Sequence, residues 1–481
     1  MRFSRTAKSS SRSLPSPNGA YISIILRSKL CVRETRCMEI IREMSLPSEL
    51  VVSWFSWSPS SNRILIGSTD MLLIFSVTNS QELARITNPT SCLTKTSLVV
   101  FGNKDYELLI FYEFGLRLSI INLITSNVID IPSIKLYGPT NAHRGFSDRP
   151  GTSDLTLMTR SGGKDIISLH TRDTFDVYKS WFPGTIDAQG MKWSSNGKWL
   201  AVCESASHGP KMLVYTADGQ LFRTWQASNS IELADTNVGS GIGIRLSQWS
   251  PNGIQIAITN YSQTVTIINM PSFTQNKKLV HTDTVNVTRS CSIWQEQTSR
   301  IESGQQHKFV QVTKEFCIPS SVIGSDELKI GVNSMSFDNS GSFLATKIEE
   351  SSTTVWIWDL ITCMLRVVLV LQATVTKILW HPTIDRQLMV LCEGEEARRF
   401  VYFWHPSWSA PHILDFAAHL SEGRVLGKTV TRWIQTEAVN PTLFFSDSQE
   451  CVLVRFRAMD DYSGITEDSL QTREMESQEE L

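Results

Sequence analysis

An internal repeat constrains the fold of this 481-residue chain more than any other feature. In each copy, an aromatic residue and a small polar residue are followed by a turn that contains Pro, Asn or Gly. The clearest copies are Trp57-Ser58-Pro59, Trp193-Ser194-Ser195-Asn196-Gly197, Trp249-Ser250-Pro251-Asn252-Gly253, Phe337-Asp338-Asn339-Ser340-Gly341 and the shorter Trp380-His381-Pro382. The turn at Pro15–Gly19 and weaker copies at Phe101, Phe146 and Trp433 complete about nine units.

Two short apolar runs follow most turns, as at residues 199–202 and 211–215. Their β-branched and aromatic residues and frequent Gly, Asn and Pro breaks favour strands over helices. The spacing is near the roughly 40–45 residues of WD-type propeller blades, except between Trp249 and Phe337, where it is about twice as long. We therefore predict an all-β fold, a WD-repeat β-propeller of about nine units in one closed ring, with two rings as the alternative. The extreme N-terminus is expected to lend the outer strand to the last unit, because closure removes exposed sheet edges.

The repeated aromatics are expected to be structural. Burying a large aromatic side chain removes about 150–250 Å² from water, on the order of 4–6 kcal/mol of gross stabilisation. The chain has a single WD dipeptide and no Gly-His pair opens a unit, so hydrophobic packing is expected to carry most of the stability. The residues predicted to pack between sheets or to hold the repeat are Trp57, Trp193, Trp249, Phe337, Trp358, Asp359 and Trp380.

The repeat defines the expected domain organisation. Residues 1–458 are assigned to the propeller, with a polar inserted loop over 280–330, and residues 459–481 to a disordered acidic tail. The first 33 residues lack acidic side chains and contain several arginines and serines, a composition that also resembles a transit peptide. Because Pro15–Gly19 is a copy of the repeat, we favour folded chain there.

Composition excludes several classes of protein. A net charge of −2 argues against nucleic acid as a partner, and no uncharged apolar run is long enough to span a membrane. The nine cysteines are scattered, with no Cys-x-x-Cys, which indicates reduced thiols in a cytosolic or nuclear protein.

The sequence contains no recognisable catalytic, cofactor or metal motif, so we predict that the chain is not an enzyme. The glycine-rich segment at residues 239–243 lacks the spacing of a dinucleotide-binding loop. His405, His412 and His419 are evenly spaced, but no cysteine or acid stands at ligand spacing beside them. An enzyme using the central channel is the last-ranked alternative. A ring with variable loops is instead typical of a binding platform.

The most specific stretch contains Lys329-Ile330-Gly331-Val332, Ser342-Phe343-Leu344-Ala345-Thr346 and Val355-Trp356-Ile357-Trp358-Asp359. It resembles the centrosomal and spindle-pole family called WD repeat-containing protein eight. Looser matches follow in the same order over nearly the whole propeller. The chain departs from the family at Lys347-Ile348-Glu349-Glu350 and at Tyr261-Ser262-Gln263.

This resemblance implies a non-enzymatic adaptor without cofactor, located in the cytoskeleton at the spindle pole body or centrosome. Its implied partners are a coiled-coil microtubule-anchoring protein and a minus-end-directed kinesin. Candidate partner contacts are Lys347, Glu349, Glu350, Asn260 and Tyr261, with ordinary solvated turns as the competing interpretation. The alternative function is a propeller scaffold in an RNA or translation-factor assembly.

Overall fold

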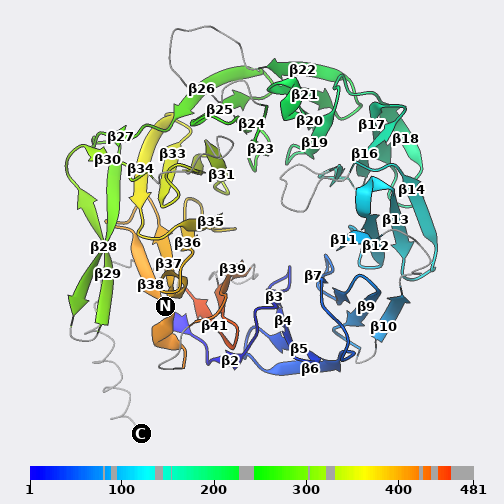
Figure 1. The fold of residues 1–481 in the computed structure, drawn as a ribbon, viewed down its shortest axis with the longest axis horizontal. Helices are drawn as coiled ribbons and strands as arrows, with labels where there is room; N and C mark the ends of the chain where they lie inside the picture. Colours follow the sequence, from blue (N-terminus) through cyan, green and yellow to red (C-terminus); the bar gives the residue numbers. More distant parts are fainter. Residues whose placement is uncertain are drawn as a thin grey trace.

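The chain folds into a ring of nine antiparallel sheets, the blades of a β-propeller (Figure 1). This confirms the predicted all-β class and the single closed ring of nine units. The computed structural model describes residues 1–79, 82–87, 95–135, 145–152, 154–226, 243–301, 304–320, 331–421, 426–434 and 442–456. The predicted acidic tail, 459–481, lies outside the described residues. Within them, no helix has the length and apolar character needed to cross a membrane.

Blades 1 to 8 each contain a meander of four strands that neighbour one another in sequence, because the tight repeat turns reverse the chain after each short apolar run. Blade 1 comprises β3 (Ser13–Pro15), β4 (Tyr21–Leu26), β5 (Lys29–Glu34) and β6 (Ile40–Ser45). Blade 2 comprises β7 (Trp54–Trp57), β8 (Arg63–Gly67), β9 (Met71–Ser76) and β10 (Glu82–Thr87). Blade 3 comprises β11 (Thr96–Phe101), β12 (Glu107–Tyr112), β13 (Arg117–Asn122) and β14 (Val128–Pro132).

The middle of the chain continues the same pattern. Blade 4 comprises β15 (Phe146–Asp148), β16 (Leu155–Ser161), β17 (Lys164–His170) and β18 (Val177–Trp181). Blade 5 comprises β19 (Ala188–Trp193), β20 (Trp199–Glu204), β21 (Lys211–Thr216) and β22 (Leu221–Gln226). Blade 6 comprises β23 (Leu246–Trp249), β24 (Gln255–Thr259), β25 (Thr264–Asn269) and β26 (Thr274–Val280).

The last three blades close the ring. Blade 7 comprises β31 (Val332–Phe337), β32 (Phe343–Ile348), β33 (Thr354–Asp359) and β34 (Met364–Val370). Blade 8 comprises β35 (Val375–Trp380), β36 (Leu388–Cys392), β37 (Phe400–Trp404) and β38 (His412–Asp415). Blade 9 comprises β39 (Val430–Ile434), β40 (Thr442–Ser446) and β41 (Glu450–Arg455), and its outer edge is formed by β1 (Arg2–Phe3) and β2 (Ala7–Lys8).

The N-terminal strands pair antiparallel with β41, with Arg2 opposite Arg455 and Ala7 opposite Cys451. The expected closure of the ring by the N-terminus is therefore present. The first residues, whose composition also resembles a transit peptide, are part of the folded ring.

The segment expected as a loop over 280–330 contains four strands in its described part, which corrects that expectation. They are β27 (Thr284–Val285), β28 (Ser292–Ile301), β29 (Gly304–Val312) and β30 (Phe316–Cys317). The hairpin β28–β29 extends blade 7, because β28 pairs in parallel with β34, Ser292 opposite Val367. The polar sequence of this segment did not predict strands, because the hairpin is stabilised by pairing with the edge of β34 rather than by an apolar run of its own.

Apolar side chains pack between blades rather than inside one central core. The nine clusters formed by the described residues each join two neighbouring blades, so that every seam has its own core. A sheet that is apolar on both faces cannot stay soluble alone, so the ring is the unit that buries these residues.

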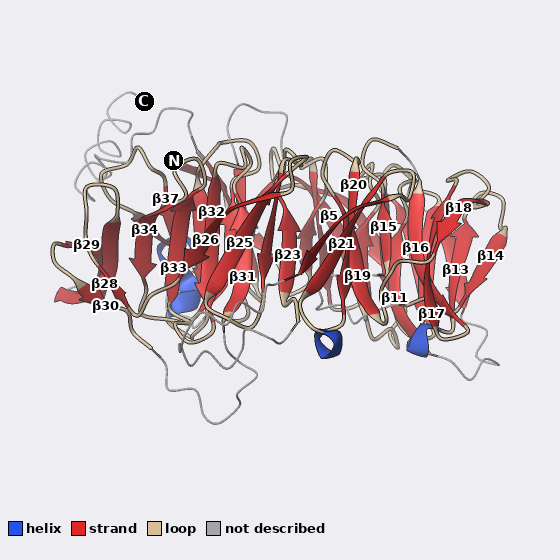
Figure 2. Ribbon diagram, turned by 90° about the horizontal axis from the view of Figure 1, so that it is seen from above, coloured by secondary structure: helices blue, strands red, loops and turns tan. Residues whose placement is uncertain are grey.

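The two faces of the ring carry different loops (Figure 2). Because strand direction alternates, the loop after the second strand and the connection to the next blade emerge on the same face, here called the connection face. It carries the 3-10 turns η1 (Glu113–Gly115), η2 (Ala206–His208), η3 (Ala397–Arg399) and η4 (Ala417–His419). The repeat turns lie on the opposite face, here called the turn face.

Candidate protein-interaction surface

The repeat tryptophans lie between neighbouring blades. Trp57 donates its indole N–H to Leu14 O of the preceding blade at 2.9 Å, and Trp249 donates to Lys192 O at 3.1 Å. Trp380 makes the equivalent bond to Ser336 O and Trp193 to the Thr156 hydroxyl. Phe337 is buried in the seam between blades 6 and 7 without a polar bond of this kind. The burial and the direction of these bonds place the aromatics as links between sheets rather than as stacking surfaces for a ligand.

The candidate contact residues come together where blades 6 and 7 meet on the connection face. Asn260 and Tyr261 lie in the loop between β24 and β25, and Glu349 and Glu350 lie in the loop after β32. Lys347 is close to the end of β32. All five side chains are partly buried.

Arg245, just before β23, connects these loops. Its guanidinium donates to a Glu349 carboxylate oxygen at 3.2 Å and to Gly331 O at 3.2 Å. It also lies 5.6 Å from the centre of the Tyr261 ring, within the range of a cation–π contact. Asn333 donates to the same Glu349 oxygen. One cation therefore ties the two candidate loops to the start of blade 7.

Glu350 fixes the chain where it enters blade 7. Its two carboxylate oxygens accept the Gly331 N–H at 3.0 and 3.1 Å, and one of them also accepts from the Gln263 amide at 3.2 Å. Gly331 has φ +88°, and a Cβ there would meet Ser262 O at 2.4 Å. Only glycine allows this close approach of the two backbones.

Lys347 and Asn260 are also committed to local bonds. Lys347 donates from Nζ to Val375 O of blade 8 at 2.7 Å, and burial lowers the pKa of its ammonium. Asn260 accepts the Ser262 N–H at 3.2 Å and so closes its own turn. The polar atoms of the predicted contacts thus hold three blades in register, and their use in partner binding stays a prediction.

Blade 7 contains a buried polar network that the sequence search missed. The Trp358 indole N–H donates to the Thr346 hydroxyl at 2.9 Å, and His281 Nε2 lies 2.8 Å from that hydroxyl. His281 Nδ1 lies 2.7 Å from Gln263 O of blade 6, and burial lowers the pKa of His281 to about 4. The insertion separates His281 from β31, so no Gly-His pair at the start of the unit could reveal it. Asp359 accepts two N–H groups of the turn that follows β33.

The three evenly spaced histidines make separate local contacts. His405 bonds Ser407, His412 lies edge-on to Trp408, and the His419 ring stacks on Phe3 at 3.5 Å between centroids. Over the part of the chain that the structure describes, no group of three or more His, Cys, Asp or Glu residues could hold a metal ion.

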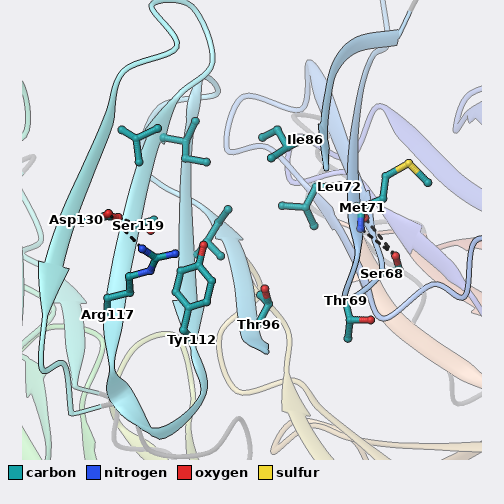
Figure 3. Close-up of a pocket in the computed structure, with 13 residues that line it drawn as sticks. Ser68, Thr69, Met71, Leu72, Ile86, Thr96, Tyr112, Arg117, Ser119 and Asp130 are labelled. Atoms are coloured by element: carbon teal, nitrogen blue, oxygen red, sulfur yellow. Dashed lines mark hydrogen bonds and ion pairs between the residues drawn. The ribbon is translucent and has the colours of Figure 1, made fainter. Parts of the chain in front are cut away.

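A cavity of about 240 Å³ lies between blades 2 and 3 (Figure 3). At its rim the Arg117 guanidinium lies over the Tyr112 ring at 4.4 Å and pairs with Asp130 at 3.5 Å. Its apolar walls are formed by Met71, Leu72, Ile86, Ile110, Ile121 and Val128. Such walls suit an apolar side chain, but Ile86 and Thr96 flank residues 88–94, outside the described part of the chain, and we assign the cavity no function.

Comparisons with known proteins agree with this fold. No protein-family model matches the chain. An uncharacterized WD repeat-containing protein of Schizosaccharomyces pombe is 23% identical over 417 residues, covering 82% of this chain and 80% of the relative. The WD repeat-containing protein WRAP73 of Mus musculus is 23% identical over 414 residues, covering 82% and 84%. Both distant relatives are WD-repeat proteins, and the similarity spans most of the ring in each.

Similarity to solved structures is found at lower identity. A crystal structure of a eukaryotic initiation factor has a TM-score of 0.54 at 11% identity, covering 85% of this chain and 89% of that chain. The C-terminal WD40 domain of Sif2 has a TM-score of 0.44 at 10% identity, covering 81% and 95%. The likeness to the initiation factor concerns the fold alone and carries no statement about partners.

Proposed function

We propose that this nine-bladed WD-repeat propeller is a non-enzymatic adaptor that anchors microtubule minus ends at a spindle pole body or centrosome and supports mitotic spindle assembly. The observation that carries the scaffold part is similarity to WD-repeat proteins over 82% of the chain, which covers most of the ring rather than a single blade. The spindle-pole part depends on the resemblance of the segment from Lys329 to Asp359 to the WD repeat-containing protein eight family.

The geometry suits a scaffold. Every seam is closed by its own apolar cluster, and β1 and β2 pair with β41 in one blade, so the ring presents its loops at fixed positions. Glu349 and Glu350, which lie on the connection face, accept structural hydrogen bonds. A rigid surface with variable loops binds proteins by complementarity and needs no cofactor.

The partners proposed for this surface are a coiled-coil microtubule-anchoring protein and a minus-end-directed kinesin. Affinity purification of the full chain from mitotic cells, followed by identification of co-purifying chains, tests this directly. We expect both classes to be enriched and the enrichment to survive nuclease treatment. Recovery of ribosomal or RNA-binding proteins that nuclease releases would instead support the translation-factor alternative.

Localisation gives an independent test. A fluorescent fusion of the full chain should form foci at the spindle poles during mitosis. A diffuse signal at every stage of the cell cycle would contradict the proposed role. A fusion carrying Trp249→Ala, which removes a buried link between blades 5 and 6, controls for foci caused by misfolded protein, because aggregates of that variant should not follow the poles.

A further inference from the structure

The connection between blades 4 and 5, residues 182–187, exposes two large apolar side chains on the connection face. Phe182 is 65% exposed and Ile186 is 63% exposed. Single exposed apolar residues are ordinary on protein surfaces and need no explanation. This loop, called the 182–187 loop below, differs because two such side chains project from a short segment whose backbone is held at several points.

Hydrogen bonds from blade 5 fix the backbone of the loop. The buried carboxylate of Glu204 accepts the N–H groups of Ile186 at 2.9 Å and Asp187 at 2.8 Å. Gly184 donates its N–H to the Tyr215 hydroxyl at 3.1 Å, and its carbonyl accepts from Lys211 Nζ at 2.8 Å. The middle and the C-terminal end of the loop are therefore tied to the same blade.

An ion-pair cluster from blades 3 and 4 holds the end of the loop from the other side. Lys135 Nζ lies 2.8 Å from Asp165, 2.6 Å from Asp187 and 2.9 Å from Ala188 O. Asp165 is fully buried and also accepts the Ala188 N–H at 2.6 Å. Arg160 pairs with both carboxylates. Buried charges are costly unless paired and hydrogen-bonded, and here they hold a surface connection in one conformation.

A fixed backbone with exposed apolar side chains is a preorganised binding surface. A partner that covers Phe182 and Ile186 does not have to order the loop, so less of the interaction energy is lost on binding. Aromatic side chains, Phe among them, are enriched at protein interfaces.

The charges around the loop indicate what kind of segment it accepts. The acids are occupied, because Asp165 and Glu204 are buried and Asp187 is paired with Lys135 and Arg160. The exposed Lys164 lies with Nζ 6.0 Å from the centre of the Phe182 ring. A partner therefore meets apolar side chains beside a cation.

We propose that the 182–187 loop is a docking site for a partner-protein segment in which carboxylates flank apolar side chains. The apolar side chains cover Phe182 and Ile186, and a carboxylate pairs with Lys164. This inference rests on the proposed adaptor function, whose partner it locates on the ring.

Site-specific photocrosslinking tests it in the full chain. Benzoylphenylalanine in place of Phe182 is compared with the same residue in place of Ile361, which is 75% exposed on the turn face. We expect a crosslink at 182, about tenfold stronger than at 361, to a peptide that contains acidic and apolar residues. Lys164→Glu should weaken that crosslink severalfold. Equal yields at the two positions, crosslinked peptides without acidic residues, or a yield unaffected by Lys164→Glu would each overturn the proposal.

The same experiment separates this inference from the proposed function. An acidic, apolar peptide crosslinked at 182 that belongs to a chain outside the spindle pole supports the docking site and contradicts the proposed function. If the Phe182→Ser, Ile186→Ser double variant recovers spindle-pole chains in the same amount as the wild type, the docking site is contradicted and the proposed function stands. An unchanged unfolding midpoint of that variant shows that its fold is retained.

Discussion

Charged residues of the connection face stabilise both the seam between blades 6 and 7 and the 182–187 loop. The two regions differ in whether the candidate contact side chains themselves make these bonds. At the seam, the charged atoms of Arg245, Glu349 and Glu350 join the blades, and of these residues Glu349 and Glu350 lie where the sequence departs from the family pattern. At the loop, Asp165 and Glu204 hold the backbone, and the side chains of Phe182 and Ile186 stay outside the network.

The difference teaches where to look for contacts on such a ring. A residue that departs from a family pattern on a half-buried loop can be compensating for a neighbouring blade. A residue available to a partner has a backbone fixed by hydrogen bonds and an exposed side chain that does not stabilise the ring. Changes at the seam and beneath the loop should therefore alter stability, whereas changes at the tip of the loop should alter binding.

The largest expected effect comes from removing the buried acid beneath the loop. Asp165→Ala leaves the 11% exposed Lys135 with only part of its counter-charge, and breaking a buried pair costs about 3–5 kcal/mol. Chemical denaturation should show this loss, and amide exchange at Ile186 and Asp187 should become faster. Asp176→Ala, at an exposed acid of the same blade, serves as the control. A loss equal to the control would mean that the cluster does not stabilise the ring.

The next effect depends on pH and concerns the network of blade 7. The folded state keeps His281 neutral, with its pKa lowered from 6.5 to about 4, so the unfolded chain binds the proton first as the pH falls. The contribution of neutral His281 to the free energy of unfolding is complete above pH 6.5. It is lost as the pH falls towards 4, by about 3 kcal/mol in total. Denaturation midpoints across this range should decline less steeply in His281→Gln. The exposed His208→Gln should keep the wild-type slope.

A smaller loss is expected at the seam. Arg245→Gln removes the cation shared by Glu349 and Tyr261, and since these groups are partly solvated we expect a loss of about 1–2 kcal/mol in the free energy of unfolding. Arg223→Gln, at an exposed arginine of β22, should change it little. If partner binding falls while stability is unchanged, Arg245 belongs to the contact surface and the contrast between the two regions fails.

The smallest effect on stability is expected at the tip of the loop. Phe182→Ser and Ile186→Ser remove side chains that are already in water, so each should alter the free energy of unfolding by less than about 0.5 kcal/mol. Calorimetric melting of the single variants measures this. A loss above about 2 kcal/mol would show that these side chains pack against the ring, and the comparison would have to be reversed.

The fold could be predicted because the repeat turns are formed by bonds between residues close together in the sequence. Ser194 donates to Asn196, and Ser250 donates to Asn252, within the same turn, so the pattern repeats in sequence as it does in space. The contacts of Arg245 and the bond from His281 to Thr346 join residues far apart in the chain, and no local spacing records them. The pairing of β28 with β34 could not be predicted for the same reason, since the strands β29 to β33 separate the two in the chain.

The pairing of β1 and β2 with β41 also sets an order of events during synthesis. Of the residues that form the ring, those around Arg2 leave the ribosome first, and their partner Arg455 is among the last to leave. Until then blade 9 is incomplete, and the face of blade 1 that packs against it stays uncovered. The ring therefore stays an open arc until β41 has been made, and the completion of blade 9 protects the uncovered face of blade 1 from association with other chains.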